Sequence, residues 1–362
     1  MSERIHNFGA GPGVLPEPVL RQAQQDIWNI GGSGIGIAEH SHRGKLFDRI
    51  IAGAEESARR LADIPDRYKI LFVQGGATQQ FAMAPMNLLP AGRTADYLIT
   101  GVWAQKAHQE AQKFGTTHVA LTGEASKFTR IPDPSEIRYS ESPAYVHLTT
   151  NNTIYGTQWK AEPPVPSGAP LVADTSSDMF SRPIDVSKYG LIYAGAQKNL
   201  GPSGVTLVII REDLLARSQK SLHTMLNYAV HAENGSMYNT PPCFGIYLMG
   251  LVMKWGLSEG GLDAIGKHNE RKAAKLYAEI DRSGFYKGTA EKGSRSRMNI
   301  TFRLPSEELE GKFVKESTAA GLDGLKGHRS VGGMRASIYN AFPDEGIDAL
   351  VSFMQEFEKK NG

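Results

Sequence analysis

Residues 171 to 204 read LVADTSSDMFSRPIDVSKYGLIYAGAQKNLGPSG and contain two short apolar runs, each followed by polar residues. The run LVA ends at Asp174, and the run LIYAGA leads into Lys198. Short apolar runs bounded by turn residues are typical of buried strands. If both are strands of one parallel sheet, their carboxyl ends open on the same edge, where open α/β sheets place ligands. We therefore expect Asp174 and Lys198 to face one pocket.

An acid and an amine on such an edge can simply form an ion pair, and the spacing alone leaves this interpretation open. The surroundings of Lys198 favour a reactive group, because the lysine follows a strand end and precedes the turn-rich segment NLGPSG. A partly desolvated lysine has a lowered pKa and forms Schiff bases with carbonyl groups, including the aldehyde of pyridoxal phosphate (PLP). An Asp that pairs with the PLP pyridinium nitrogen keeps the ring electron-withdrawing. The order acid, strand, lysine therefore suits a PLP enzyme.

The rest of the chain alternates between strand-like and helix-like segments. KILFVQ, ADYLITG and VTLVIIRE have the composition of strands, and the first two lead into helical patterns. The alternation from residue 69 to 218 predicts an α/β fold with a mostly parallel sheet covered on both faces. The pattern then changes to SRMNITFRL and two further helices, which predicts a small α+β domain. We expect a large domain over residues 17–260, and a small domain formed by residues 261–362 with the N-terminal arm 1–16.

Composition limits the partners and the compartment. The 362 residues include 40 basic and 38 acidic side chains, so no strong field favours nucleic acid or an anionic membrane. The single cysteine, Cys243, excludes an internal disulfide and any multi-cysteine metal site. The apolar run 244–257 is too short for a membrane span and contains Lys254, which favours a buried helix. The start has no apolar core of a secretory signal, so we expect a cytoplasmic protein.

A glycine-rich stretch ends in SHRG at residues 41 to 44. It lacks a preceding strand, and Leu46 stands where a phosphate-binding loop of the Walker type needs Ser or Thr. A metal role for His40 with His42 is the weaker interpretation, and we predict no metal site. An anion contact suits Arg43 better, because guanidinium groups match carboxylate and phosphate geometry.

These motifs together resemble the phosphoserine aminotransferase family, class V aminotransferases with the type I PLP-enzyme fold. The likeness includes the lysine segment and the motifs NFGAGPGVLP (7 to 16), SHRG (41 to 44), NNTIYGT (151 to 157), NGSMYNTPP (234 to 242) and GHRSVGGMRASIYNA (327 to 341). It therefore covers nearly the whole chain. The resemblance implies a large domain with a seven-stranded, mostly parallel sheet, and PLP as cofactor.

The resemblance also assigns cofactor contacts that the pattern alone leaves as turns or core. Lys198 would hold PLP and move protons, Asp174 would pair with the ring nitrogen, and Trp103 would stack on the ring. The further cofactor-binding residues would be Gly76, Ala77, Thr78, Thr153, Gln197, Asn239 and Thr240. Of these, Asn239 and Thr240 would reach the PLP of the neighbouring subunit, so the resemblance predicts a homodimer.

The implied substrates each carry an α-carboxylate and a distal anion. L-glutamate would donate its amino group to 3-phosphonooxypyruvate, giving O-phospho-L-serine and 2-oxoglutarate in serine biosynthesis. Use of 4-phosphohydroxy-L-threonine in pyridoxine biosynthesis stays open. Arg335 would bind the α-carboxylate. The His-Arg pairs would bind the distal anion: His42, Arg43, His328 and Arg329.

One departure from the family pattern concerns the loop after the first strand. Some family members have an arginine where this chain has Ala77 and Thr78. A cationic contact to the substrate phosphate is therefore missing here or replaced by another group.

Two alternatives come from different classes of protein. A cysteine desulfurase or a serine-glyoxylate aminotransferase would share the PLP chemistry. A desulfurase needs a nucleophilic cysteine on a mobile loop, whereas Cys243 follows two prolines and precedes the expected buried helix. A noncatalytic α/β module, in which Asp174 and Lys198 merely pair, would be colourless.

Overall fold

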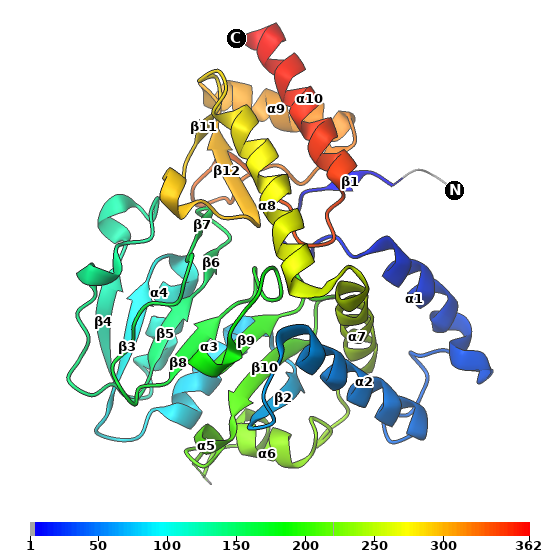
Figure 1. The fold of residues 1–362 in the computed structure, drawn as a ribbon, viewed down its shortest axis with the longest axis vertical. Helices are drawn as coiled ribbons and strands as arrows, with labels where there is room; N and C mark the ends of the chain where they lie inside the picture. The colour runs from blue at the N-terminus through cyan, green and yellow to red at the C-terminus, as the bar shows by residue number, and fades with distance from the viewer. Residues whose placement is uncertain (1–3, 220) are drawn as a thin grey trace.

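The central element of the fold is a seven-stranded sheet, shown in the computed structural model of Figure 1, which describes residues 4–219 and 221–362. The strand order is β2-β10-β9-β8-β5-β3-β4. The strands are β2 (Tyr68–Val73), β3 (Thr94–Ile99), β4 (Thr116–Thr122), β5 (Val146–Thr149), β8 (Leu171–Asp174), β9 (Tyr189–Gly195) and β10 (Thr206–Arg211). Strand β10 runs antiparallel to β2 and β9, and the other neighbouring pairs are parallel. The predicted mostly parallel α/β sheet is confirmed.

Both faces of the central strands are buried, because successive side chains of a strand point to opposite sides of the sheet and enter different cores. In β2, Ile70 and Phe72 belong to one hydrophobic cluster, while Leu71 and Val73 belong to another. The first cluster contains side chains of α2 (Lys45–Ala62) and α7 (Cys243–Ser258), and the second those of α3 (Gly76–Leu88), α4 (Val102–Ala111) and α6 (Tyr228–Glu233). Helix α7 is the buried helix predicted from the apolar run 244–257.

Strands β8 and β9 are the two apolar runs from which the fold was predicted. They are parallel neighbours, and Asp174 at the end of β8 is paired in register with Tyr193 of β9. The chain leaves β9 through Ala196 and Gln197 to reach Lys198. The expectation that Asp174 and Lys198 follow strand ends on one edge of one sheet is therefore confirmed. The carboxyl ends of β2, β3 and β5 lie on the same edge, because these strands run in the same direction.

A smaller antiparallel sheet is formed by the C-terminal part of the chain. Its strand order is β11-β12-β14, and three helices accompany it. The elements are β11 (Lys287–Gly288), β12 (Asn299–Arg303), β14 (Met334–Ser337), α8 (Gly261–Ile280), α9 (Glu307–Ala319) and α10 (Asp344–Asn361). The N-terminal strand β1 (His6–Asn7) pairs with β13 (Leu322–Asp323), and Phe8 belongs to the same core as Phe302 and Phe313. Figure 1 shows this part above the large sheet, with α8 extending between the two.

Two helical segments are shorter than the sequence pattern indicates. The spacing of Trp103, Ala107, Ala111 and Phe114 predicts one apolar helix face, but α4 ends at Ala111, and Phe114 lies beyond it with 41% of its surface exposed. The helix after β10, α5, covers only Glu212–Leu215. The remaining helices and strands are α1 (Glu17–Asn29), β6 (Asn151–Asn152), β7 (Thr157–Gln158) and the 3-10 turns η1 (Ile30–Gly32), η2 (Glu124–Ser126), η3 (Pro134–Glu136), η4 (Val186–Lys188), η5 (Thr224–Leu226) and η6 (Lys292–Ser294).

A helix that crosses a membrane must be both long and apolar. Within residues 4–219 and 221–362, no helix combines the length and the apolar character that a membrane crossing requires.

Candidate active site

Lys198 is partly buried just beyond the end of β9. Its Nζ donates a hydrogen bond to Thr153 Oγ1 at 2.9 Å and lies 5.5 Å from the centroid of the Trp103 ring. Burial lowers the pKa of Lys198, Asp174 opposes this shift, and the positive charge of Arg335 adds to it. A lysine in this setting loses its proton more readily than a solvated one and so becomes a nucleophile and a base.

Asp174 is buried beside this lysine at the end of β8. Its Oδ1 accepts hydrogen bonds from the backbone N–H of Ser176 at 3.0 Å and from Ser176 Oγ at 2.6 Å. Ser176 Oγ in turn accepts from the N–H of Gly195, which fixes the turn after β8 to the end of β9. Burial raises the pKa of Asp174, while Lys198 and the Ser176 hydrogen bonds oppose the shift.

Sequence reasoning missed Ser176 as a positioning residue. The available signal was the Asp-Thr-Ser order directly after a strand, since an Asp that accepts from the residue two positions on forms an Asx turn. This turn orients one oxygen of Asp174. Its other oxygen accepts no hydrogen bond within the described part of the chain.

Arg335 reaches the same place from the smaller sheet. It lies in β14, and its Nη1 donates to the main-chain oxygen of Thr153 at 3.4 Å. Burial lowers the pKa of Arg335, and its buried Nε has no hydrogen-bond partner among the residues that the structure describes. Thr153 therefore meets Lys198 with its hydroxyl and Arg335 with its carbonyl, although Arg335 is 182 residues away in sequence.

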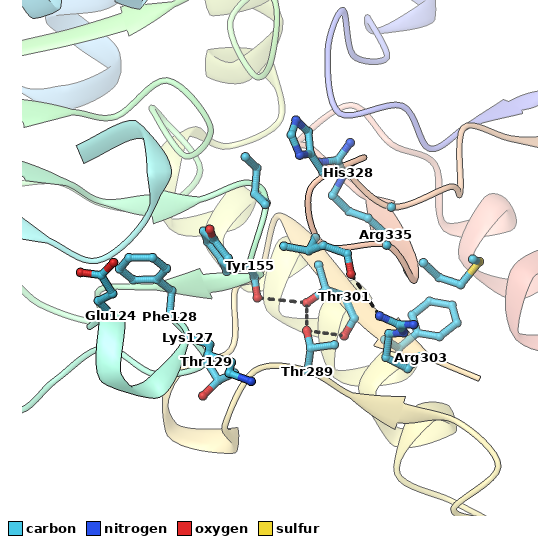
Figure 2. Close-up of a pocket in the computed structure, with 16 residues that line it drawn as sticks. Glu124, Lys127, Phe128, Thr129, Tyr155, Thr289, Thr301, Arg303, His328 and Arg335 are labelled. Atoms are coloured by element: carbon cyan, nitrogen blue, oxygen red, sulfur yellow. Dashed lines mark hydrogen bonds between the residues drawn. The ribbon is translucent and has the colours of Figure 1, made fainter. Parts of the chain in front are cut away.

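A cavity of about 430 Å³ adjoins Arg335. Figure 2 shows His328 and Arg335 on one side of it and Phe128 and Tyr155 on the other, with Thr301 between them. A hydrogen bond from Thr301 Oγ1 to the main-chain oxygen of Tyr155 joins the two sides at 3.1 Å. Lys198, Asp174 and Trp103 are not among the lining residues, so the cavity lies beside the lysine pocket rather than around it.

The start of α3 offers backbone donors at the same edge of the sheet. Gly75 and Gly76 have φ angles of 88° and 64°, and no side chain caps the helix. A Cβ on Gly75 would lie 2.5 Å from Gln79 Cβ, and its φ of 88° is one that L side chains rarely adopt, so this tight turn favours glycine. Helix N-termini with free N–H groups attract anions, and Ala77 and Thr78 are in this first turn.

The N-terminal arm packs directly on the lysine loop, which sequence reasoning did not foresee. The N–H of Gly13 donates to the main-chain oxygen of Gln197 at 2.7 Å, and a Cβ on Gly13 would lie 2.8 Å from the main-chain oxygen of Lys198. Tyr339 donates its hydroxyl proton to the main-chain oxygen of Ala10 at 2.6 Å. The glycines of NFGAGPG were the available signal, since close backbone approach needs small residues.

Four predicted site residues are not bonded to this cluster in the part of the chain that the structure describes. His42 and Arg43 are in the loop before α2, and Asn239 and Thr240 are exposed in the segment between α6 and α7. In residues 4–219 and 221–362, no hydrogen bond or ion pair links any of them to Lys198, Asp174 or Arg335. Arg329 is exposed next to His328, whose pKa is lowered by burial and then by the charges of Arg335, Arg329 and Lys106.

Known proteins are similar to this chain over nearly its whole length. The profile of aminotransferase class V matches residues 5–350. A phosphoserine aminotransferase of Herpetosiphon aurantiacus is 55% identical over 359 residues, which cover 99% of each chain. The chain belongs to the phosphoserine aminotransferase family of class V.

Solved structures of this family have nearly the same fold as this phosphoserine aminotransferase chain. That from Bacillus circulans subsp. alkalophilus is 53% identical, with a TM-score of 0.98 over 100% of both chains. A PLP-bound phosphoserine aminotransferase from Trichomonas vaginalis is 38% identical, with a TM-score of 0.93 over 97% of this chain and 100% of its own. The ureidoglycine-glyoxylate aminotransferase of Bacillus subtilis, at 14% identity and a TM-score of 0.80, shares the fold alone.

Membership of this family agrees with the environment of Cys243, the residue that would have to be the nucleophile of a cysteine desulfurase. Cys243 is the first residue of α7, its Sγ contacts the main-chain oxygen of Pro241 at 3.3 Å, and burial raises its thiol pKa. A nucleophilic cysteine needs the opposite shift.

Proposed function

We propose that this chain catalyses the reversible transfer of an amino group from L-glutamate to 3-phosphonooxypyruvate, with PLP as cofactor, giving O-phospho-L-serine and 2-oxoglutarate. The observation that carries the proposal is the meeting of Lys198 and Arg335 on Thr153, beside the buried Asp174. It places a reactive amine next to a guanidinium group that suits an α-carboxylate. The full-length identity of 55% to a phosphoserine aminotransferase supports the choice of substrates.

The residues at the sheet edge fit PLP in three respects. Asp174 has one oxygen held by Ser176 and one without a partner in the described chain, as a ring N–H would require. The buried Nε1 of Trp103 likewise has no partner among the described residues, and its ring is partly exposed. The uncapped first turn of α3 suits a phosphate. The residues that would hold PLP are Gly76, Ala77, Thr78, Trp103, Thr153, Asp174, Gln197 and Lys198.

When bound, PLP supplies an aldehyde that takes up amino groups and a ring that withdraws electrons from the substrate Cα. Lys198 removes the Cα proton of the amino-acid substrate and returns one to the Cα of the keto acid in the opposite half-reaction. Its lowered pKa suits this exchange, because the amine must be neutral to accept a proton. Asp174, which is oriented by Ser176, would be the negative partner of the ring nitrogen.

Both substrates present two anionic groups to the basic side chains. Arg335 binds the α-carboxylate, since its guanidinium group is anchored on Thr153 beside the lysine. His328 and Arg329 bind the distal γ-carboxylate or phosphate. Support for this assignment comes from the position of His328, which lines the same cavity as Arg335.

The remaining predicted cofactor- and substrate-binding residues are best explained by a second subunit. His42, Arg43, Asn239 and Thr240 lie on loops that make no hydrogen bond or ion pair to the lysine cluster within the described chain. We propose a homodimer in which Asn239 and Thr240 reach the cofactor phosphate of the neighbouring subunit. His42 and Arg43 then complete the distal anion site across the same interface.

Mixing two inactive variants tests this shared site. Lys198→Ala removes the amine from one subunit, and Asn239→Asp sets a carboxylate against the cofactor phosphate contributed by the other. Refolding the two variants together leaves one intact site in each mixed dimer, so about a quarter of the wild-type activity returns if subunits pair at random. Activity that stays at the level of the separate variants would contradict the shared site.

The domain boundaries remain part of this proposal. We divide the chain into a large domain, residues 17–260, and a small domain formed by residues 1–16 and 261–362. Support comes from Phe8, which shares a core with α8, α9 and α10 rather than with the large sheet. A reducing compartment such as the cytoplasm suits the single cysteine, Cys243.

The absorbance spectrum of the purified protein tests the proposed function first. We expect a visible band from bound PLP that O-phospho-L-serine removes and 2-oxoglutarate restores. A band that O-phospho-L-serine leaves unchanged would move the substrate to another class V type. No band after incubation with PLP would contradict the role of Lys198.

A further inference from the structure

Lys106 is a basic residue beside the site that sequence reasoning did not select. It lies on α4 three residues after Trp103, and residues at this spacing share one face of a helix. Its Nζ lies 4.9 Å from the centroid of the Trp103 ring, while the Nζ of Lys198 lies 5.5 Å from the same centroid. The side-chain nitrogens of two lysines therefore lie near one indole ring, and one of them belongs to the proposed catalytic lysine.

The charge of Lys106 also reaches the proposed distal anion site. Together with Arg335 and Arg329, it lowers the pKa of His328. Lys106 comes from α4 beside the large sheet, whereas His328 belongs to the loop before β14.

No carboxylate among the described residues forms an ion pair with these basic groups. In residues 4–219 and 221–362, none of Lys106, Arg329 and Arg335 forms an ion pair. By contrast, Lys113, just beyond the end of α4, is paired with Glu110 at 2.8 Å. A group of unpaired positive charges repels itself and is stabilised by a bound anion, most strongly by one with more than a single charge.

The loop at the start of α3 provides no cation for this purpose, because it carries Ala77 and Thr78. We propose that Lys106 is a substrate-binding residue that contacts the phosphate of 3-phosphonooxypyruvate and O-phospho-L-serine, and that it makes the enzyme favour phosphate over the γ-carboxylate of L-glutamate. This inference rests on the proposed function. A phosphate monoester carries a charge of about −1.5 to −2 at neutral pH, so an added positive charge stabilises it more than a carboxylate.

The position of Lys106 over the Trp103 ring also limits the freedom of its side chain before an anion binds. Held over the ring, the ammonium group is kept near the site before substrate arrives, which reduces the loss of side-chain entropy on binding. If Lys106 served only to hold the indole ring for the cofactor, its loss would weaken PLP binding and leave the preference between substrates unchanged. The two roles are therefore separable by experiment.

The test compares Lys106→Met with wild type, since methionine keeps an unbranched stem without the charge. Lys113→Met is the matched control, because it removes the same charge from an exposed lysine just beyond the same helix. We expect kcat/KM for O-phospho-L-serine to fall about tenfold or more in Lys106→Met, mainly through KM, as for a lost charge-assisted hydrogen bond. For L-glutamate we expect a loss of less than about threefold. Lys106→Arg should recover most of the phosphate preference.

Inorganic phosphate gives a readout that does not depend on turnover. Its binding to the PLP-loaded protein, followed by calorimetry, should weaken about tenfold in Lys106→Met and stay unchanged in Lys113→Met. Equal losses for both substrates, or no loss for either, would overturn the inference. So would a loss of PLP affinity with an unchanged substrate preference.

Failure of the proposed function has a different signature. In that case the wild-type protein itself would not react with O-phospho-L-serine. The phosphate titration would still decide the role of Lys106, because equal phosphate affinity in wild type and Lys106→Met would overturn it.

Discussion

Lys198 Nζ lies 2.9 Å from the hydroxyl oxygen of Thr153, and the guanidinium group of Arg335 lies 3.4 Å from the carbonyl oxygen of the same residue. The proposed base and the proposed carboxylate-binding group thus contact two different oxygens of one buried threonine. An α-amino acid whose carboxylate binds Arg335 therefore has its Cα held near Lys198. Because Lys198 and Arg335 are held at a fixed separation, Lys198 can act on the Cα of both substrates.

Asp174→Asn separates the electronic role of the carboxylate from its role in folding. We expect kcat to fall by roughly 10² to 10³-fold, because the negative partner of the ring nitrogen is lost. The free energy of unfolding of the PLP-free protein should stay the same or rise at pH 7, since the amide oxygen can still accept from Ser176 and no charge is buried. Steady-state kinetics and urea unfolding measure the two effects.

Asp185→Asn is the control for this variant. Asp185 forms the same turn, accepting from the N–H and Oγ of Ser187, but it is exposed. It should keep wild-type kcat. An Asp174→Asn enzyme with unchanged kcat would contradict the assigned role of the carboxylate.

Arg335→Ala should weaken both half-reactions about tenfold or more in kcat/KM, because both substrates lose the same charge-assisted contact to the α-carboxylate. Single-turnover kinetics with L-glutamate and with O-phospho-L-serine measure this. Arg271→Ala, which removes an exposed arginine paired with Asp344, should change neither value. Wild-type kcat/KM for both substrates in Arg335→Ala would exclude the proposed role.

The buried His147 is expected to make the free energy of unfolding depend on pH. It is buried against Tyr97 and Tyr193, its Nδ1 has no partner among the described residues, and burial lowers its pKa to about 3. Between about pH 3 and its unfolded pKa of about 6.5, the unfolded chain binds one proton more than the folded protein. Stability therefore rises with pH through this window and is lost as the pH falls through it.

His147→Phe tests this contribution, because phenylalanine keeps a ring against Tyr97 and cannot titrate. The difference in unfolding free energy between wild type and variant should shift in favour of wild type by up to about 1.4 kcal/mol per pH unit from pH 3 to 6.5. Urea unfolding at a series of pH values measures it. His223→Phe, at an exposed position, should not change the slope. A difference that does not vary with pH would show that His147 titrates normally.

Lys106→Met should raise the pKa of His328. The positive charge of Lys106 disfavours a second positive charge on the imidazole, so its removal lets His328 bind a proton at higher pH. Titration of ¹⁵N-labelled histidines by NMR measures this shift. The pKa of His328 should stay at its wild-type value in Lys113→Met. An unchanged value in Lys106→Met would mean that its charge does not reach the His328 loop.

Sequence patterns alone predicted the sheet and the edge that carries the site. Apolar runs too short for helices had to be buried strands, and the polar residues that end them had to lie where the strands open. This reasoning placed Asp174 and Lys198 on one edge, as β8 and β9 show. It also identified the helix over 244–257, because a long apolar segment with one lysine has to be buried along most of its surface.

Which residues meet at that edge depends on contacts between distant parts of the chain. Arg335 reaches Thr153 across 182 residues, Gly13 packs on Lys198 from the N-terminal arm, and Lys106 lies over the Trp103 ring. The antiparallel direction of β10 also depended on packing, since its composition is the same in either direction. Local patterns record which side chains must be buried, whereas contacts between distant segments depend on how whole layers pack together.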